Sequence, residues 1–342
     1  MSRQFKIEKH WYRTSCSALM FLLLPFSWLF RLLIFIRYFL YRFHFKKTYR
    51  FPVPVIVVGN VTVGGTGKTP FVIWLAEILR NQGYRPGIVS RGVGGKKISE
   101  PYWVDGMSDP EWVGDEAVLL AKRTHCPLVV CVDRVLAVKE LLQKSSCNIV
   151  ISDDGLQHYR LHRDIEIAIV DGLRELGNGK MLPAGPLREP VKRLKSVDWV
   201  VVNGSSQLEN SIFKKIKFSR MDLRGDVLIS LQTPHEEMLL SAFRNKTAHV
   251  VAGIGNPERF FSMLREHRIH VIEHIFQDHY LYRRSDIYFC DNLAVMMTEK
   301  DAIKCMKFAD RRHWYLKVSA EVDSLAEEKI SVLLKQYDFK AK

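Results

Sequence analysis

The stretch PVIVVGNVTVGGTGKTP, residues 54–70, constrains the fold more than any other part of the chain. Residues 55–58 form a short apolar run of β-branched side chains, which predicts a buried strand. A glycine-rich turn follows, and Thr69 with the amphipathic residues 71–80 predicts a helix after it. A strand, a glycine loop and a helix in this order form a cradle in which backbone N–H groups and a helix N-terminus bind phosphate.

The residues expected to bind a nucleoside triphosphate are Thr62, Val63, Gly64, Gly65, Thr66, Gly67, Lys68 and Thr69. We expect Lys68 to reach the β- and γ-phosphates and the Thr69 hydroxyl to hold Mg²⁺. The usual pattern G-x-x-x-x-G-K-[ST] has glycine where this chain has Thr62, but the three glycines that follow keep the loop flexible. The alternative is an ordinary turn with a surface lysine.

The positive charge of the chain is concentrated near its start. Residues 1–50 hold ten Lys and Arg residues and one acidic residue, and so carry +9 of the formal net charge of +14. The remaining residues form a nearly ordinary globular body, long enough for one large or two medium domains. This distribution argues against a nucleic-acid binder.

Residues 1–49 are predicted to form a basic, apolar helical segment at a membrane. Residues 14–45 are rich in Leu, Phe, Ile and Tyr, and are interrupted by Arg31, Arg37 and Arg42. The uncharged window before Arg31 is at the short limit for spanning a bilayer, and it contains Pro25. We therefore expect helices that lie in the membrane interface, with arginines on anionic lipid. The alternative is a pair of core helices packed on the main domain.

Residues 50–225 are predicted to form the nucleotide domain. Apolar runs expected to be strands cover residues 86–90, 128–132, 148–152, 166–170 and 198–202. They predict an α/β fold with a mainly parallel sheet and helices on both faces, and ligands gather where such strands end. Residues 101–114 are expected to be an irregular loop, and Asp115 is expected to open a helix. Asp153 is the candidate Mg²⁺-side carboxylate, and Asp171 is the competing placement.

Residues 226–342 are predicted to form a smaller α/β domain that contributes to the active-site cleft. Strands are expected at 270–275, 294–298 and 314–318, and helices at 258–267 and 300–306. A final helix near residues 324–336 is expected to close this domain. Gly253 and Gly255 alone are weak signs of a second phosphate site, because no third glycine follows.

A series of motifs resembles the tetraacyldisaccharide 4′-kinase family over residues 20–320. In order, they are VGNVTVGGTGKTP, SRG, GDEA, DR, SDDGLQH, LPAGPLREP, AGIGNPERF, DHY and TEKDA. The resemblance implies a P-loop kinase that transfers the γ-phosphate of ATP to the 4′-hydroxyl of a tetraacyl disaccharide 1-phosphate, giving lipid IVA in lipid A biosynthesis. It also implies a peripheral or monotopic enzyme on the cytoplasmic face of a Gram-negative inner membrane, in contact with membrane lipids and without an obligate protein partner.

The resemblance also implies roles for individual residues. Lys68 and Thr69 match positions that hold phosphates and Mg²⁺, and Asp153 and Glu189 match acidic positions near the metal. Arg188 matches a charge-stabilising position. Asp115 matches the catalytic base, and His279 matches its partner. Asp154, Gln157 and His158 belong to the active-site motif SDDGLQH. Without the family, Asp115 could be a helix cap. A membrane-associated ParA/MinD-like ATPase is the alternative function, but its second lysine is replaced here by Val63.

Overall fold

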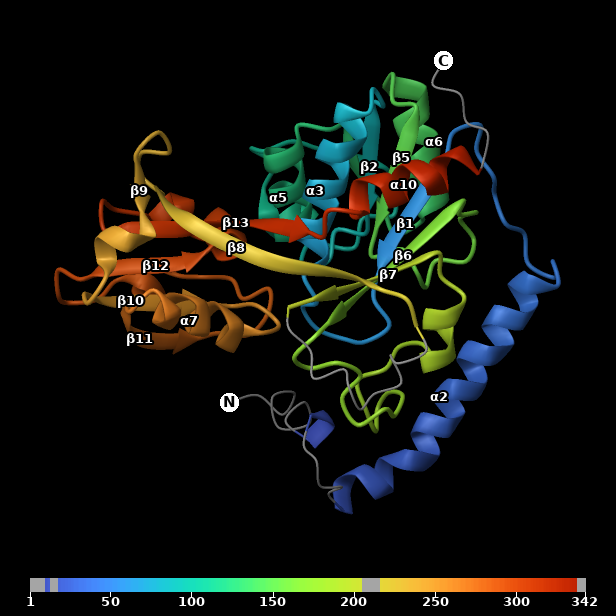
Figure 1. Cartoon of the computed structure of the whole chain (residues 1–342), viewed down its shortest axis with the longest axis horizontal. Coiled ribbons are helices and arrows are strands. Elements are labelled where there is room, and N and C mark those ends of the chain that lie inside the picture. The colour runs from blue at the N-terminus through green and yellow to red at the C-terminus, as the bar shows by residue number, and fades with distance from the viewer. Residues whose placement is uncertain (1–9, 13–17, 205–215, 337–342) are drawn as a thin grey trace.

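The computed structural model describes residues 10–12, 18–204 and 216–336. Within these ranges a single sheet of 13 strands runs through the molecule, in the order β11-β10-β12-β13-β8-β7-β6-β1-β5-β2-β4-β3, with β9 paired to β8. Figure 1 shows two lobes joined by the long strands β8 and β13. We call the lobe around β1 the nucleotide half and the lobe around β10 the smaller half.

The nucleotide half contains the predicted parallel strands. Its strands are β1 Val55–Gly59, β2 Pro86–Ser90, β3 Tyr102–Val104, β4 Leu128–Val130, β5 Ile149–Asp153, β6 Ile165–Asp171 and β7 Trp199–Asn203. The central strand β1 lies between β5 and β6, parallel to both. Its side chains alternate between the two hydrophobic cores, because successive residues of a strand point to opposite faces. Ile56 and Val58 join one core, and Val55 and Val57 join the other.

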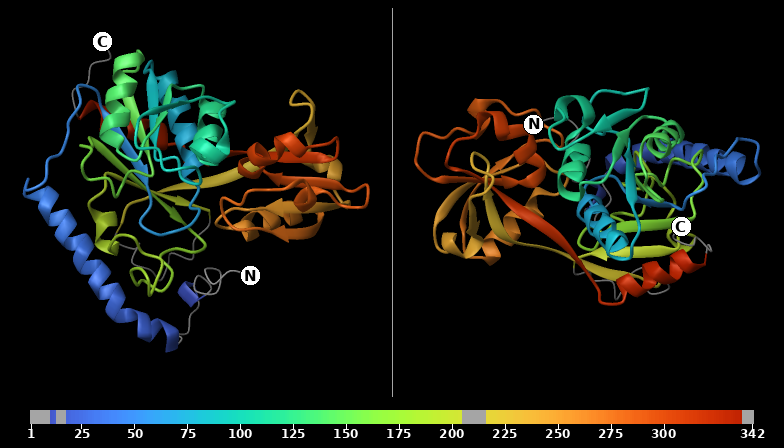
Figure 2. Two further views of the ribbon diagram at one scale, coloured as in Figure 1. Left: turned by 180° about the vertical axis from the view of Figure 1, so that it is seen from behind. Right: turned by 90° about the horizontal axis from the view of Figure 1, so that it is seen from above.

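Helices cover both faces of this sheet. They are α3 Lys68–Asn81, α5 Asp115–Thr124, α6 Arg134–Lys144 and the 3₁₀ helix η1 Val191–Lys195. Helix α3 packs in one core through Phe71 and Leu75, while α6 packs in the other through Val138 and Leu141. The α/β class, with a mainly parallel sheet covered on both faces, is therefore confirmed (Figure 2).

The expectation of an irregular loop at residues 101–114 is wrong. Strand β3 pairs antiparallel with β4, and helix α4 covers Pro110–Val113. The helix has a recognisable start, since Asp109 accepts a hydrogen bond from the backbone N–H of Glu111 and proline occupies the first helical position.

The smaller half is inserted between β8 and β13. Its elements, with those two strands, are β8 Ser219–Ser230, β9 Glu237–Leu239, η4 Leu240–Phe243, β10 Thr247–Ala252, α7 Pro257–Glu266, β11 His270–Ile275, α8 Arg284–Ile287, β12 Ala294–Thr298, α9 Glu299–Cys305, η5 Met306–Phe308 and β13 His313–Val322. Strands β8 and β13 pair antiparallel along most of their length. The boundary expected near residue 225 therefore falls inside β8.

The last helix, α10 Ala326–Lys335, does not close the smaller half as expected. Strand β13 returns along β8 to the nucleotide half, and α10 packs there through Ile330, Leu333 and Leu334 in the same core as α3. Figure 1 shows α10, in red, on the nucleotide half and away from the orange elements of the smaller half.

The N-terminal segment contains one long helix, α2 Ala18–Arg42, with Pro25 inside it. The helix lies along the outside of the nucleotide half (Figure 2). Its inner side is attached through Phe30 and Ile34, which pack on the core, and through Ser27, whose hydroxyl donates to the Met181 carbonyl at 2.8 Å. The stretch Met20–Arg42 is long and apolar enough to cross a membrane, and only 11% of its apolar window is buried. The core-helix alternative is therefore disfavoured. Residues 1–9 and 13–17 of the predicted segment lie outside the described residues.

Candidate active site

The glycine loop connects β1 to α3, and its glycines are required by the backbone. Gly64 and Gly67 have φ values of 97° and 90°, a left-handed region that other residues rarely adopt. A side chain at Gly67 would also overlap the Asn203 amide, whose Nδ2 donates to the Thr66 carbonyl at 2.9 Å. Asn203 ends β7, so the loop is fastened to a second strand of the sheet. This leaves a backbone cradle at the start of α3.

The start of the loop is held by the segment that carries Arg188. The backbone of Thr62 forms an antiparallel bridge with Leu187, and the N–H of Val63 donates to the Pro186 carbonyl at 2.8 Å. Thr62 takes the place of the usual first glycine because this part of the loop runs as a short paired segment. The Pro-rich segment LPAGPLREP thus packs directly against the phosphate loop.

A charged cluster at the carboxyl end of β5 brings together three of the predicted residues. Lys68 Nζ lies 3.5 Å from Asp154 Oδ1, and Arg188 Nη1 lies 3.1 Å from Asp154 Oδ2. Burial opposes the ionisation of Asp154, but the two cations outweigh it and lower its pKa to about 2. Asp154 is therefore an anion that holds Lys68 and Arg188 beside the glycine loop.

Asp153 lies in the same cluster with a different electrostatic balance. Its Oδ2 accepts a hydrogen bond from the Ser90 hydroxyl at 3.1 Å. Burial, with the carboxylates of Glu116 and Asp154 nearby, raises the pKa of Asp153 well above its ordinary value. A divalent cation would remove this repulsion, and hard oxygen ligands are those that Mg²⁺ prefers. Asp153, with the Ser90 hydroxyl beside it, therefore offers hard oxygen donors of the kind that a magnesium ion takes.

Glu189 and the competing Asp171 are engaged elsewhere. Oε1 of Glu189 accepts a hydrogen bond from the Tyr159 hydroxyl at 2.7 Å. Oδ1 of Asp171 accepts from the backbone N–H groups of Leu173 and Arg174, as expected of a turn aspartate. Among the described residues, no three His, Cys, Asp or Glu side chains gather as a ready metal site.

Asp115 and His279 meet across the two halves. His279 Nδ1 lies 2.9 Å from Asp115 Oδ1, although the residues are 164 positions apart. The N-cap of α5 is Gly114 and has no side-chain cap bond, so Asp115 does not cap the helix. Burial lowers the pKa of His279, but its hydrogen bond to Asp115 outweighs this, and the pKa is raised above the ordinary value.

Asp115 is held as an anion by two lysines of α9. Lys304 Nζ lies 3.2 Å from its Oδ2 and Lys300 Nζ lies 3.9 Å from its Oδ1. Burial raises the pKa of Asp115, but the two lysines and the histidine outweigh it and hold the pKa well below its usual range.

Our sequence reasoning did not assign a role to either lysine, nor to Gly94, where a side chain would overlap His279. The sequence signal that could have pointed to Lys300 and Lys304 is their four-residue spacing, which places both on one helix face.

The smaller half also touches the phosphate loop itself. A Cβ atom at Gly255 would lie 2.5 Å from the Gly65 nitrogen, so the two backbones are in direct contact. Arg174 Nη1 donates to the Gly255 carbonyl at 2.6 Å, and Asn256 Nδ2 donates to Asp171 Oδ2 at 3.3 Å. The loop IGNPERF thus closes over the phosphate loop rather than forming a separate phosphate site.

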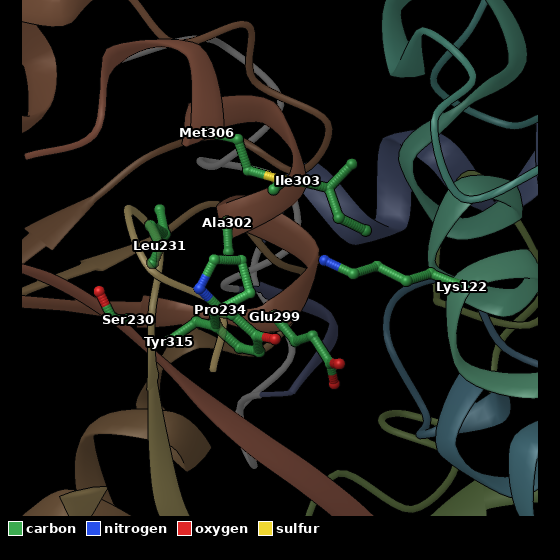
Figure 3. Close-up of a pocket in the computed structure, with 9 residues that line it drawn as sticks. All are labelled: Lys122, Ser230, Leu231, Pro234, Glu299, Ala302, Ile303, Met306 and Tyr315. Carbon is green, nitrogen blue, oxygen red and sulfur yellow. The ribbon is translucent and has the colours of Figure 1, made fainter. Parts of the chain in front are cut away.

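A small, mainly apolar pocket lies apart from these residues. Figure 3 shows it between α9 and the ends of β8 and β13, with Lys122 of α5 entering from the other half. None of the predicted site residues lines it.

The fold and the site together define a phosphate-loop nucleotide-binding enzyme with its acidic residues at the end of the neighbouring strand. Comparison with known proteins narrows this class. A family model described as tetraacyldisaccharide-1-P 4′-kinase matches residues 19–336. The chain belongs to the tetraacyldisaccharide 4′-kinase family, and it is a kinase.

Curated relatives and a solved structure agree with this assignment. A tetraacyldisaccharide 4′-kinase of Nitrosococcus oceani is 48% identical over 96% of this chain and 94% of its own length. One from Coxiella burnetii is 49% identical over 93% of this chain and 91% of its own. A crystal structure of LpxK from Aquifex aeolicus, described as an apo form in complex with ATP, superimposes with a TM-score of 0.77. It is 33% identical and covers 93% of this chain and 99% of its own. The resemblance inferred from the motifs is confirmed.

Proposed function

We propose that this protein transfers the γ-phosphate of ATP to the 4′-hydroxyl of a tetraacyl disaccharide 1-phosphate, giving lipid IVA in lipid A biosynthesis. The observation that carries the proposal is the Asp115–His279 contact between the two halves, next in sequence to Glu116, whose carboxylate acts on Asp153 of the acidic cluster. A proton-accepting pair next to a phosphate cradle is what transfer to a hydroxyl group requires, and a protein that only hydrolyses ATP has no need of a second half that completes the site.

The residues of the cradle act mainly through charge and position. Lys68 and Arg188, now paired with Asp154, lie where they can turn to the β- and γ-phosphates and stabilise charge as the phosphoryl group moves. Thr69 and Asp153 would hold Mg²⁺, which when bound neutralises phosphate charge. Glu189 follows Arg188 in the same segment and so belongs to this site. Because one oxygen of its carboxylate accepts a hydrogen bond from Tyr159, we assign it the role of positioning this segment rather than that of a direct Mg²⁺ ligand.

Asp115 and His279 accept the proton of the sugar hydroxyl as one unit. The Asp115 carboxylate is only 2% exposed, with both oxygens engaged, while the His279 ring is 22% exposed. The resemblance gave the role of base to Asp115 and that of partner to His279. These exposures favour the reverse, in which the hydroxyl meets His279 first, and Asp115 orients the ring and stabilises its positive charge.

The acylated substrate is reached from the membrane surface. The outer side of α2 exposes large apolar residues along its length, among them Phe21, Trp28, Leu32 and Phe35. Such a face is suited to the acyl region of a bilayer. We place the enzyme on the cytoplasmic face of the inner membrane, where ATP is available, with α2 in contact with lipid. In a liposome flotation assay the full-length protein should float with anionic vesicles, and a protein that stays at the bottom would contradict this arrangement.

The test of the reaction is transfer of labelled phosphate from γ-labelled ATP to the disaccharide 1-phosphate in mixed micelles. We expect a labelled lipid with the protein and none with Lys68→Ala. ATP hydrolysis that releases label only as free phosphate, with the lipid unlabelled, would refute the kinase and favour the ParA/MinD-like ATPase.

A further inference from the structure

Lys300 of α9 is a partly buried lysine at the junction of the two halves. Its Nζ donates to Glu116 Oε1 and to Asp278 Oδ1, both at 2.9 Å, and its side chain is 13% exposed. The same ammonium group lies 3.9 Å from Asp115 Oδ1. Glu116 and Asp115 belong to α5 of the nucleotide half, whereas Asp278 belongs to the loop that carries His279. One cation therefore joins three elements that meet at the proton-accepting pair.

The backbone of His279 depends on this arrangement. His279 has a φ of 59°, a left-handed conformation that a residue other than glycine seldom adopts without support. Its N–H donates to Asp278 Oδ1 at 3.1 Å, the same oxygen that accepts from Lys300. The ammonium group of Lys300 thus fixes Asp278, and Asp278 fixes the backbone from which the imidazole extends.

Lys304, one helical turn further along α9, completes the set. It contacts the second oxygen of Asp115 at 3.2 Å and is itself paired with Asp301 Oδ1 at 3.1 Å. Because the two lysines hold Asp115 in its ionised form, its carboxylate remains a hydrogen-bond acceptor. It therefore keeps the proton of His279 on Nδ1, which leaves the lone pair of Nε2 for the substrate.

We infer that Lys300 is a positioning residue, which holds Asp115 and His279 in register across the two halves while the sugar hydroxyl is deprotonated. This role rests on the proposed function. It differs from a purely structural ion pair because Lys300 also sets the electrostatic field of the imidazole, together with Asp115 and Asp278. A structural pair would affect stability alone.

The chain offers a matched control for this distinction. Arg123 of α5 and Glu299 of α9 form another ion pair between the same two helices, at 2.6 Å and with similar burial. Arg123 also contacts Ser319 and the Val318 carbonyl of β13, away from the pair. Arg123→Met therefore removes an interaction between the halves without removing a charge beside His279.

The experiment compares Lys300→Met, Lys300→Arg and Arg123→Met in the full-length enzyme. We expect Lys300→Met to lower kcat by about 10–100-fold, because a small misplacement of reacting groups is costly, with KM for ATP changed by no more than about twofold. Loss of the cation should also raise the pKa of the imidazole, and so move the acidic limb of the pH profile upward by about 1 pH unit. Lys300→Arg should restore the position of the limb. Arg123→Met should leave it unchanged and keep kcat within about threefold.

Two further measurements keep the inference testable if transfer is absent or Lys300→Met folds poorly. The His279 ring can be titrated by NMR without substrate, and its pKa should rise in Lys300→Met, so this arm is independent of the proposed reaction. Asp278→Asn lies on a more exposed loop and removes a negative charge 3.8 Å from His279 Nε2, so it should shift the same pKa downward. Equal behaviour of Lys300→Met and Arg123→Met, or an Asp278→Asn variant without a downward shift, would overturn the inference. Absence of lipid labelling by the wild type would instead overturn the proposed function.

Discussion

Replacement of Asp115 by asparagine separates the chemical role of this residue from its structural one. In the folded protein Asp115 neutralises Lys304, whose side chain is only 4% exposed. Removing one partner of a buried ion pair usually costs about 3–5 kcal/mol, because the remaining charge stays buried. Lys304 keeps Asp301 as a second partner at 3.1 Å. We therefore expect the lower end of that range, about 3 kcal/mol in the free energy of unfolding.

The activity of Asp115→Asn should fall for a different reason. The amide no longer stabilises a positively charged imidazole and can favour the wrong tautomer of His279, so kcat should fall by about 10²–10⁴-fold with ATP affinity nearly intact. The double variant Asp115→Asn/Lys304→Met also removes the cation that has lost Asp115 as a partner, and replaces it with a side chain of similar length. It should recover part of the lost stability, because Asp301 then keeps only its hydrogen bonds from Gly253, Tyr282 and Thr298, and it should recover none of the lost activity.

The assay pairs urea unfolding with labelled phosphate transfer on the same preparations. Single and double variants are compared at the same pH, and activity is measured well below the unfolding transition. A double variant that recovers activity together with stability would refute the reasoning, because Asp115 would then serve only to neutralise Lys304. A main defect in KM for ATP would also refute it, since it would assign Asp115 to nucleotide binding.

Further predictions concern the phosphate loop and its surroundings. Lys68→Ala should abolish phosphate transfer, because the lysine acts on phosphate charge, and should lower stability only modestly, because Arg188 stays paired with Asp154; near-normal turnover would remove Lys68 from the mechanism. Gly255→Ala should lower kcat/KM for ATP by about 10-fold, because the new methyl group meets the Gly65 backbone, which cannot move aside as a side chain does. Gly106→Ala, which meets only ordinary contacts at 3.4 Å, is its control, and equal effects of the two would contradict the contact. The pKa of Asp154 is lowered from 3.8 to about 2, so its ionised form contributes stability that is complete above pH 3.8 and is lost as the pH falls through 2. Asp154→Asn should therefore flatten the acid dependence of unfolding in this window, and an unchanged dependence would be inconsistent with the charge pairs.

Much of the nucleotide half could be predicted because its strands are short runs of β-branched residues. The predicted strand at 86–90 matches β2, and that at 294–298 in the smaller half matches β12. Strand β3 was missed because it is an edge strand of three residues, with tyrosine exposed and valine buried, too short to show an alternating pattern. The position of α10 was missed because its partner core is set by the long return of β13, which no local pattern encodes.

The site, too, has a part that the sequence predicts and a part that only the fold reveals. The glycine loop is contiguous, so its residues are readable in one stretch of sequence. Asp115 and His279 are not, and only the family resemblance paired them. Lys300 and Lys304 look like an ordinary solvated helix face, since lysines are rarely buried. Their burial follows from the meeting of α9 with α5, a tertiary contact that spacing alone does not reveal.

The continuous sheet has a consequence for how this enzyme can be divided. The nucleotide half holds both β1 and the last described helix, since α10 returns to it after β13. The smaller half is therefore an insertion, entered through β8 and left through β13. A single cut near residue 225 would divide β8 in the middle of its pairing with β13. It would also separate α10 from the nucleotide half on which it packs. Exchange of the smaller half between relatives requires two junctions, one in β8 and one in β13. Both must keep the pairing register of these two strands.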